Sequence, residues 1–396
     1  AFGAAYDFPF AALVAAVTLV AALANKDAKR FPVNSVTLII ILFICWSTFT
    51  TFFALEPERA WNEWNRVMKT FFMVLAAMYL MNSEKDTKLL AWVVGLSLGF
   101  YGLKGGVFTI TSGGVNRVFG PEKSYIEDNN HLALALLVSL PIVWYLILHA
   151  PRKWIRMGLA GAAILTLISV VGTYSRGALL GGAAMLSFLW LKSRHKVVTG
   201  LAVALIIPVV LSLMPQEWFD RMNTINDYKE DASALGRFNA WGFALNVARQ
   251  HFLGGGFDVF TRPMFLIYAP DPLDPHAAHS IYFQVLGEHG FIGLALYLSL
   301  MVAAWRMGSR VIKSCKGQES LKWAADLAAM SQVSIIGFAI GGAFLSLAYY
   351  DLYYYIIVLL VLLQKALVFK EAENIQRVMA DIEAQPKSLM SRSRMP

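Results

Sequence analysis

Apolar runs of about twenty residues recur along almost the whole chain, and they constrain its fold more than any other feature. A helix needs about 20 apolar residues to cross the ~30 Å hydrocarbon layer of a bilayer. Lipid offers no partner to backbone N–H and C=O groups, so such runs must be helices unless they close a barrel. The sequence therefore predicts an all-α polytopic membrane protein. We expect about eleven spans of this length, at residues 8–24, 36–54, 67–82, 89–110, 131–149, 155–173, 177–191, 197–214, 281–305, 325–346 and 352–369.

The composition and the placement of charge support the same class. The chain is 57% hydrophobic and 15% charged, whereas soluble domains are roughly 45–50% apolar and about 25% charged. A net charge of +8 would also suit a nucleic-acid partner, but the basic residues gather in alternate loops. Positive loops of membrane proteins face the cytoplasm, so we expect the basic loops and the C-terminus inside. The loops predicted to face outside are 55–66, 111–130, 174–176, 215–280 and 347–351.

The spans divide the chain into four regions. We expect an N-terminal transmembrane bundle at 1–214, an outside loop domain with helices at 215–280, C-terminal transmembrane helices at 281–369 and a cytoplasmic tail at 370–396. The sequence begins at Ala1 without Met, and an odd number of spans would place that end outside. We therefore expect one further helix before it, which would give twelve spans.

Three cations fall at or near the outside ends of predicted spans: Lys104, Arg117 and Arg176. A cation at membrane depth is a candidate functional residue, because leaving it without a partner costs a few kcal/mol. Arg176 stands in the tight turn Ser175-Arg176-Gly177, and a guanidinium suits bidentate contact with phosphate. The structural alternatives are that Lys104 extends to lipid headgroups and that Arg176 contacts a backbone carbonyl or a headgroup.

The long outside loop contains a predicted helix, ASALGRFNAWGFALNVARQHF, with apolar residues at three- and four-residue spacing. Arg237 and Trp241 share one face of it. Arg237 lies either on the polar edge of an interfacial helix or in an active cleft, and the sequence leaves both open. Gly254 to Gly256 end this helix. They do not form a phosphate loop, since no Lys-Ser or Lys-Thr pair follows.

Acids, prolines and histidines crowd the segment before the next span. Asp271, Asp274, His276 and His279 could be taken for a metal site, but their spacing is irregular and no HExxH or CxxC frame is present. We expect no metal. His279 stands at the water boundary, and a histidine with a near-neutral pKa suits general-base catalysis. The alternative is that His279 caps the helix or faces headgroups.

Two acidic residues lie farther along. Glu288 follows His279 by nine residues, which in a regular helix places it on the opposite face, about 180° away. We therefore expect Glu288 to be a buried structural carboxylate paired with a neighbouring helix. Asp351 stands among tyrosines at residues 349–355. It could orient a base or bind sugar hydroxyls, or it could simply start a helix within an aromatic belt.

Several of these segments together resemble the O-antigen ligase family (WaaL, the Wzy_C superfamily). They are Ser175-Arg176-Gly177, the helix from Arg237 to Trp241 with its glycine run, and His279-Ser280-x-x-Phe283-x-x-x-x-Glu288-x-Gly290. AAYDFPFA and GPEKSYIEDNNHLAL resemble the exosortase-associated O-glycosylation ligase branch. The resemblance covers nearly the whole chain. Such families usually carry Leu where Phe283 stands, an apolar exchange that weakens the match little.

The resemblance implies a GT-C-like fold in the bacterial inner membrane with a periplasmic active site. It implies transfer of a glycan from undecaprenyl diphosphate to a lipid A–core sugar hydroxyl, with inversion and without a metal or cofactor. His279 would take the proton from the acceptor hydroxyl, and Arg117, Arg176 and Lys104 would hold the diphosphate. Arg237 and Asp351 are further substrate-binding candidates. We expect a monomer in contact with membrane lipid and no nucleic-acid partner.

Two related activities share the donor: O-antigen polymerase and protein O-oligosaccharyltransferase. A transporter of polyprenyl lipids or solutes is the alternative from another class. Polar residues at mid-membrane in matching halves would favour transport, whereas here they gather at one outside face. The sequence leaves open the acceptor, the sugar and the oligomeric state.

Overall fold

The computed structural model describes residues 31–192, 196–212, 214–223 and 232–384, and all regular structure in these ranges is helical. Seven helices in the described part are long and apolar enough to cross a membrane. The prediction of an all-α polytopic membrane protein is thus confirmed. The seven are α3 (Ser35–Phe52), α5 (Glu84–Thr111), α6 (Asn129–Leu148), α7 (Lys153–Gly172), α13 (Ile281–Ser314), α14 (Lys322–Gly341, flanked by η1, Glu319–Leu321, and η2, Gly342–Phe344) and the first part of α15 (Asp351–Ala384).

The remaining expected spans have other forms. The expected span 67–82 is the second half of α4 (Pro57–Leu80), whose charged first half comes from the preceding loop. α8 (Arg176–Lys192) and α9 (Lys196–Leu211) have 17 and 16 residues, fewer than the ~20 that a perpendicular span needs. The expected span 8–24 lies outside the described residues, apart from isolated positions.

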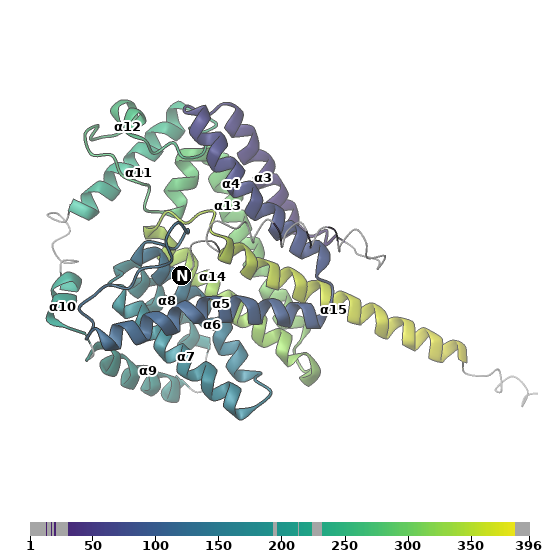
Figure 1. Cartoon of the computed structure of the whole chain (residues 1–396). Coiled ribbons are helices and arrows are strands. Elements are labelled where there is room, and N and C mark those ends of the chain that lie inside the picture. The colour runs from purple at the N-terminus through teal and green to yellow at the C-terminus, as the bar shows by residue number, and fades with distance from the viewer. Residues whose placement is uncertain are drawn as a thin grey trace, which may run out of the picture.

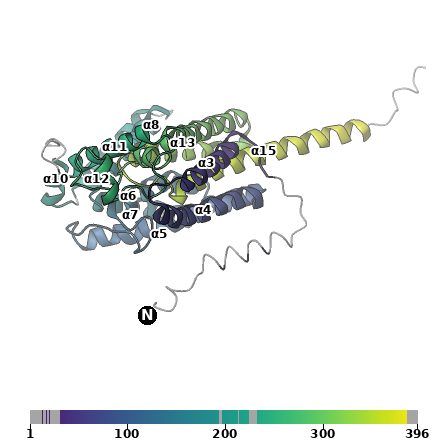
Figure 2. The ribbon, with the colours of Figure 1, turned by 90° about the horizontal axis from the view of Figure 1, so that it is seen from above.

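α6 and α15 lie at the centre of the bundle. α6 packs against α5, α7, α8 and α14, and α15 packs against α4, α5, α13 and α14. Residues 356–361 of α15 have no exposed surface. In Figure 1, α15 runs between a group formed by α3, α4 and α13 and a group formed by α5 to α9, then leaves the bundle as a single helix. Figure 2 shows from above how α15 extends beyond the other helices.

The long loop after α9 is ordered where it is described. It contains α10 (Gln216–Asn223), α11 (Ala232–Gln250) and α12 (Arg262–Tyr268). α11 and α12 share a small core of their own, in which the rings of Phe243 and Phe265 stack with centroids 4.3 Å apart. α11 also packs along α13. The loop therefore forms a layer over one end of the bundle, as Figure 1 shows.

The helix that follows His279 begins at Ile281 and is interrupted two residues beyond Glu288. α13 is broken at Gly290, whose backbone has φ 65° and ψ −169°. The glycine loop after α11 packs against this break: the N–H groups of Gly255 and Gly256 donate to the carbonyls of Gly287 and Glu288, both at 2.8 Å. A Cβ at Gly290 would lie 2.5 Å from the Phe252 carbonyl oxygen. The glycines therefore allow two backbones to approach closely.

Candidate functional site

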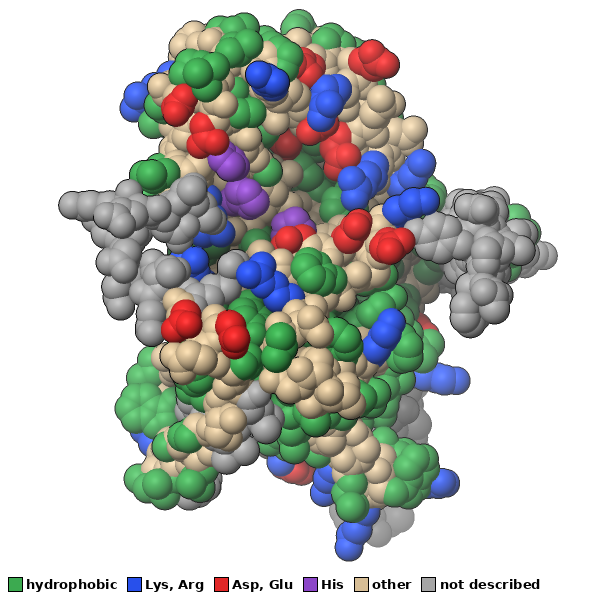
Figure 3. Space-filling model, turned by 60° about the vertical axis from the view of Figure 1, so that its left-hand side comes forward, with side chains coloured by type: hydrophobic (Ala, Val, Ile, Leu, Met, Phe, Trp, Pro, Cys, Tyr) green, Lys and Arg blue, Asp and Glu red, His purple; other side chains and the backbone are tan. Residues whose placement is uncertain are grey.

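A cavity of about 320 Å³ opens at the N-terminal end of α6. It brings together His279, Arg176 and Arg237, three predicted site residues that are far apart in the sequence. Histidines gather in a hollow on this face in Figure 3, with acidic and basic side chains around it. The residues that line the cavity are Asp128, Asn130, His131, Tyr174, Arg176, Gly177, Arg237, His279 and Leu345.

His279 lies on a strained bend just before α13 and not on a helix face. Its φ is +43°, a left-handed conformation for a residue with a side chain, which costs about 1–2 kcal/mol. Hydrogen bonds hold the bend: the His279 N–H donates to Ser346 Oγ at 2.8 Å, and Trp241 Nε1 donates to the Ala278 carbonyl at 2.9 Å. Ser280 is the N-cap residue of α13. The surrounding elements therefore hold the backbone at His279 in place.

α11 supports the segment that leads to His279. The Asn239 side-chain amide donates to the carbonyls of Asp271 and Asp274, both at 2.8 Å, and its carbonyl accepts from the Asp271 N–H at 2.8 Å. The rings of Trp241 and Phe283 stack with centroids 4.9 Å apart and planes 8° from parallel. The Asp-Pro segment is thus a rim fastened to α11, and it carries the catalytic candidate at its end.

Arg176 is the first residue of α8, and local chemistry explains its position. The Ser175 hydroxyl accepts from the Ala178 N–H at 3.3 Å, the pattern by which serine caps a helix. Tyr174 has φ 62° and turns the chain sharply, and its hydroxyl donates to the Gly114 carbonyl at 2.7 Å. The tight turn therefore ends α7, starts α8 and places the Arg176 guanidinium in the cavity lining.

The cavity suits an anion. The N-termini of α6, α8 and α13 all lie at its wall, and each helix N-terminus carries a partial positive charge from its unbonded N–H groups. Arg176 and Arg237 add full charges. The carboxylate in the lining is Asp128, and its Oδ1 already caps α6 by accepting from the N–H groups of Asn130 and His131. The balance favours a phosphate-bearing ligand.

The same surroundings depress the basicity of His279. Burial is the largest cause, followed by the positive charge of Arg237 and then His131 and His276, while Asp128 acts in the opposite direction; the result lowers the His279 pKa to about 4. The imidazole is therefore neutral at neutral pH and able to accept a proton. An anion bound beside it would raise this pKa.

The other predicted substrate-binding residues lie outside the cavity. Arg117 stacks over the ring of Tyr174, with its guanidinium carbon 5.7 Å from the ring centroid, so one lining residue separates it from the cavity. Lys104 is exposed on α5. Asp351 starts α15, where its Oδ1 accepts from the Leu352 N–H at 2.8 Å. Substrate roles for these three residues remain predictions.

Glu288 is buried, with 3% of its surface exposed. It accepts hydrogen bonds from the Tyr349 hydroxyl and from the Asp258 N–H. Glu288 is buried as expected, but its partners lie in the turn before α15 and in the loop after α11 rather than on a neighbouring helix. Its structural role stays a prediction. Next to it, His289 Nδ1 lies 2.7 Å from Thr50 Oγ1. This polar group connects α3 to the break in α13.

Sequence reasoning missed the part of the site that precedes α6. Asp128 caps α6, and with Asn130 and His131 it also lines the cavity. The signal was the polar run DNNH immediately before an apolar helix. No spacing rule connects that run to His279, which is about 150 residues away, so only the packing of α6 near the start of α13 could reveal it.

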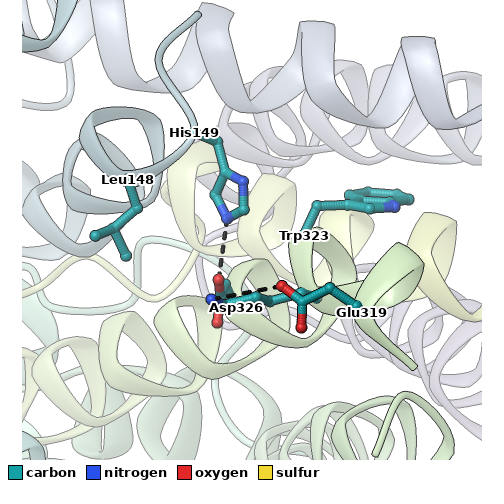
Figure 4. A pocket seen from close by; sticks show the side chains of 6 residues that line it. Leu148, His149, Glu319, Trp323 and Asp326 are labelled. Carbon is teal, nitrogen blue, oxygen red and sulfur yellow. Dashed lines mark hydrogen bonds and ion pairs between the residues drawn. The ribbon is translucent and has the colours of Figure 1, made fainter. Parts of the chain in front are cut away.

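A second cavity, of about 570 Å³, lies at the opposite end of α6 (Figure 4). With 20 residues at 1.5 Å each, α6 separates the two cavities by about 30 Å. His149 pairs with Asp326 at 3.0 Å across this second cavity. It is larger but contains none of the predicted site residues, and its lining has two carboxylates, Glu319 and Asp326, and one lysine, Lys322, so it offers no comparable positive field. We therefore place the functional site in the smaller cavity.

Among the residues that the structure describes, no group of three or more His, Cys, Asp or Glu side chains is placed to hold an ion. In particular, Asp271, Asp274, His276 and His279 do not converge. His276 instead pairs with Asp274, with Nε2 and Oδ1 2.8 Å apart.

The fold and the site define a multi-pass α-helical membrane protein with a cation-lined cavity at one end of its bundle. Residues 161–298 match the family described as O-antigen ligase, and residues 1–151 match a family of unknown function (DUF5935). No curated protein matches the chain. Over residues 161–298 the resemblance to the O-antigen ligase family is therefore confirmed, whereas the exosortase-associated branch stays a prediction. The matched segment includes Arg176, Arg237 and His279, and supports a function of the O-antigen ligase or polymerase type.

Proposed function

We propose that the protein is an O-antigen ligase, a membrane glycosyltransferase that moves a glycan from undecaprenyl diphosphate to a sugar hydroxyl of lipid A–core. The observation that carries this proposal is the meeting of His279 with Arg176 and Arg237 in one cavity, within an O-antigen ligase domain. In this proposal the fold is GT-C-like, the membrane is the bacterial inner membrane, and the cavity faces the periplasm.

The cavity supplies the groups that an inverting transfer requires. The acceptor oxygen attacks the anomeric carbon from the side opposite the diphosphate, so that a new C–O bond forms as the bond to the diphosphate breaks. The proton of the acceptor hydroxyl passes to the His279 imidazole, and the electron pair of the broken bond leaves with the diphosphate. A positioned general base contributes roughly 10²–10⁴-fold to such a rate.

Arg176, Arg237 and the helix N-termini stabilise the charge that develops on the departing diphosphate. Removing one fixed donor of this kind costs about 10²–10³-fold in other enzymes. We propose that Arg117 and Lys104 contact the diphosphate from outside the cavity lining and hold the donor before the reaction. Asp351 is proposed to contact sugar.

Binding of the donor also prepares the base. With only the protein's own groups around it, His279 has a pKa of about 4, which makes the imidazole a weak base. The diphosphate brings negative charge next to it and offsets the positive charges that lower its pKa. His279 thus becomes more basic when the donor is bound. This coupling favours an order in which the donor binds before the acceptor is deprotonated.

The related activities differ only in the acceptor. An O-antigen polymerase would use a second lipid-linked glycan, and a protein O-oligosaccharyltransferase would use a protein hydroxyl. A transporter is less well supported, because the charged cavity lies at one end of α6 and not at the middle of the bundle. Broken transporter helices usually place their binding sites near the membrane midplane.

The decisive experiment supplies the purified protein in vesicles with the lipid-linked donor and, separately, lipid A–core, a second lipid-linked glycan or a pilin-like protein. The proposal expects glycan transfer to lipid A–core only. His279→Ala should abolish the transfer. Asp326→Asn, at the opposite end of α6, is the matched control and should retain it. Near-normal ligation by the His279→Ala protein would refute the base assignment, and transfer only to another acceptor would reassign the activity.

A further inference from the structure

The loop that precedes α6 is built to hold Tyr125 in place. The Gly120 N–H donates to the Glu127 carbonyl at 2.9 Å, and a Cβ at Gly120 would lie 1.7 Å from the Ile126 carbonyl oxygen. The Lys123 N–H donates to the Glu127 carboxylate at 2.8 Å. These contacts close the loop on itself, so the Tyr125 ring projects from an ordered support rather than from a mobile tip.

Tyr125 meets two charged residues of α4. Its hydroxyl donates to Glu63 Oε1 at 3.3 Å, and the Arg66 guanidinium carbon lies 3.7 Å from the centroid of its ring. Arg66 also contacts the Glu63 carboxylate at 3.5 Å. The Glu63 side chain is 23% exposed and that of Arg66 is 51% exposed. The hydrogen bonds within this cluster are long, and its polar groups remain open to a ligand.

The cluster continues toward α15. The Tyr350 ring centroid lies 6.5 Å from that of Tyr125, and Asp351 directly follows Tyr350 at the start of α15. The cluster therefore contains two carboxylates, one guanidinium and an aromatic surface. The catalytic mechanism uses neither Glu63 nor Arg66.

This cluster lies next to the His279 cavity. The segment that carries Tyr125 also carries Asp128 and His131, which line the cavity. In Figure 3, acidic and basic side chains surround the hollow that contains the histidines. A ligand that extends from His279 along the 125–131 segment would meet the cluster.

We propose that Glu63, Arg66, Tyr125 and Asp351 form a saccharide subsite beside the His279 cavity. Carboxylates accept hydrogen bonds from sugar hydroxyls, a guanidinium donates to them, and an aromatic ring packs against the apolar face of a pyranose. The two carboxylates disfavour a phosphate, which belongs in the cation-lined cavity. The reaction that the sugar enters rests on the proposed function, whereas sugar binding does not.

The test separates sugar binding from diphosphate binding. Glu63→Gln, Tyr125→Leu and the milder Tyr125→Phe are compared with the wild-type protein in nanodiscs. Glu58→Gln and Tyr79→Leu, at exposed positions on α4, are matched controls. Transfer kinetics give KM for lipid A–core and for the lipid-linked donor. Titration with sugar-free undecaprenyl diphosphate reports on the neighbouring cavity and on folding, and titration with the free core oligosaccharide reports on sugar binding without turnover.

Loss of a hydrogen bond to a charged group weakens binding by about tenfold or more. Glu63→Gln and Tyr125→Leu should therefore raise the KM for either lipid A–core or the lipid-linked donor by about tenfold. The KM of Tyr125→Phe should lie between those of these variants and that of the wild-type protein. Affinity for undecaprenyl diphosphate should not change. A raised KM for lipid A–core, with weaker binding of the free oligosaccharide, assigns the subsite to the acceptor. A raised KM for the donor alone assigns it to the donor glycan.

Two outcomes overturn the subsite. In one, neither KM nor oligosaccharide affinity changes. In the other, undecaprenyl diphosphate binding weakens in parallel, which indicates a structural role for the cluster. If the wild-type protein transfers no glycan, the proposed function fails. The oligosaccharide titration then still tests whether the subsite binds sugar, because it does not depend on turnover.

Discussion

Replacing Arg237 with glutamine should raise the pKa of His279. The guanidinium of Arg237 is the second cause of the depressed pKa of His279, after burial. Glutamine keeps a polar side chain at this half-buried position but removes the charge. The change therefore tests whether the positive charge in the cavity, in addition to burial, lowers the pKa of His279, the proposed catalytic residue.

The structure bounds the size of the effect. The His279 pKa lies at about 4, against 6.5 for an unperturbed histidine. This difference corresponds to about 3 kcal/mol against the protonated form. Because burial is the larger cause and persists in the variant, the new pKa should fall between these values. At pH 5 a base with a pKa of about 4 is about nine-tenths neutral, and each upward step in the variant's pKa lowers that fraction.

The assay is the pH dependence of kcat/KM, whose acid limb reports the pKa of the essential base in the free enzyme. Each profile is normalised to its own plateau, since Arg237→Gln should also weaken donor binding. The acid limb should lie near pH 4 for the wild-type protein and at higher pH for the variant. Arg249→Gln, at the exposed end of the same helix α11, is the matched control. An acid limb that stays in place or moves to lower pH in Arg237→Gln would refute the electrostatic reasoning.

Three further predictions follow from the geometry. Arg176→Lys keeps the charge but not the bidentate fork, so transfer should fall by about tenfold or more in the vesicle assay; full activity would show that charge alone suffices. Gly290→Ala forces a side chain onto a backbone with φ 65° and against the Phe252 carbonyl, and should lower the thermal unfolding temperature, whereas Gly158→Ala, with open space at its Cβ, should not. Asn239→Ala removes three hydrogen bonds to the segment before His279 and should lower kcat while leaving undecaprenyl diphosphate affinity unchanged; an unchanged kcat would contradict the bracing role of α11.

The all-helical membrane fold could be predicted from the sequence. Each segment that crosses a bilayer must be long enough and apolar enough on its own, and it must satisfy its own backbone hydrogen bonds. Arg176 and His279 could also be identified as candidate site residues from the sequence. Burying a charged or titratable group beside an apolar span costs free energy, so such a residue is rare there and stands out. Local capping chemistry also depends on near neighbours in the sequence: Asp128 before α6 and Ser175 before α8 accept hydrogen bonds from N–H groups two or three residues away.

Only the tertiary structure decided how these parts combine. It set Arg237, a position that the sequence left between two roles, in the cavity, and it joined His131 and Tyr174 to His279. It broke α13 at Gly290 and used the glycine loop to hold the break. The physical reason is the sequence distance over which the interactions act. The apolar pattern of a helix and the residues that cap it lie within one segment, so both can be recognised along the chain. The cavity, the depressed pKa of His279 and its left-handed bend arise from helices that are distant in sequence and meet only when the bundle is packed.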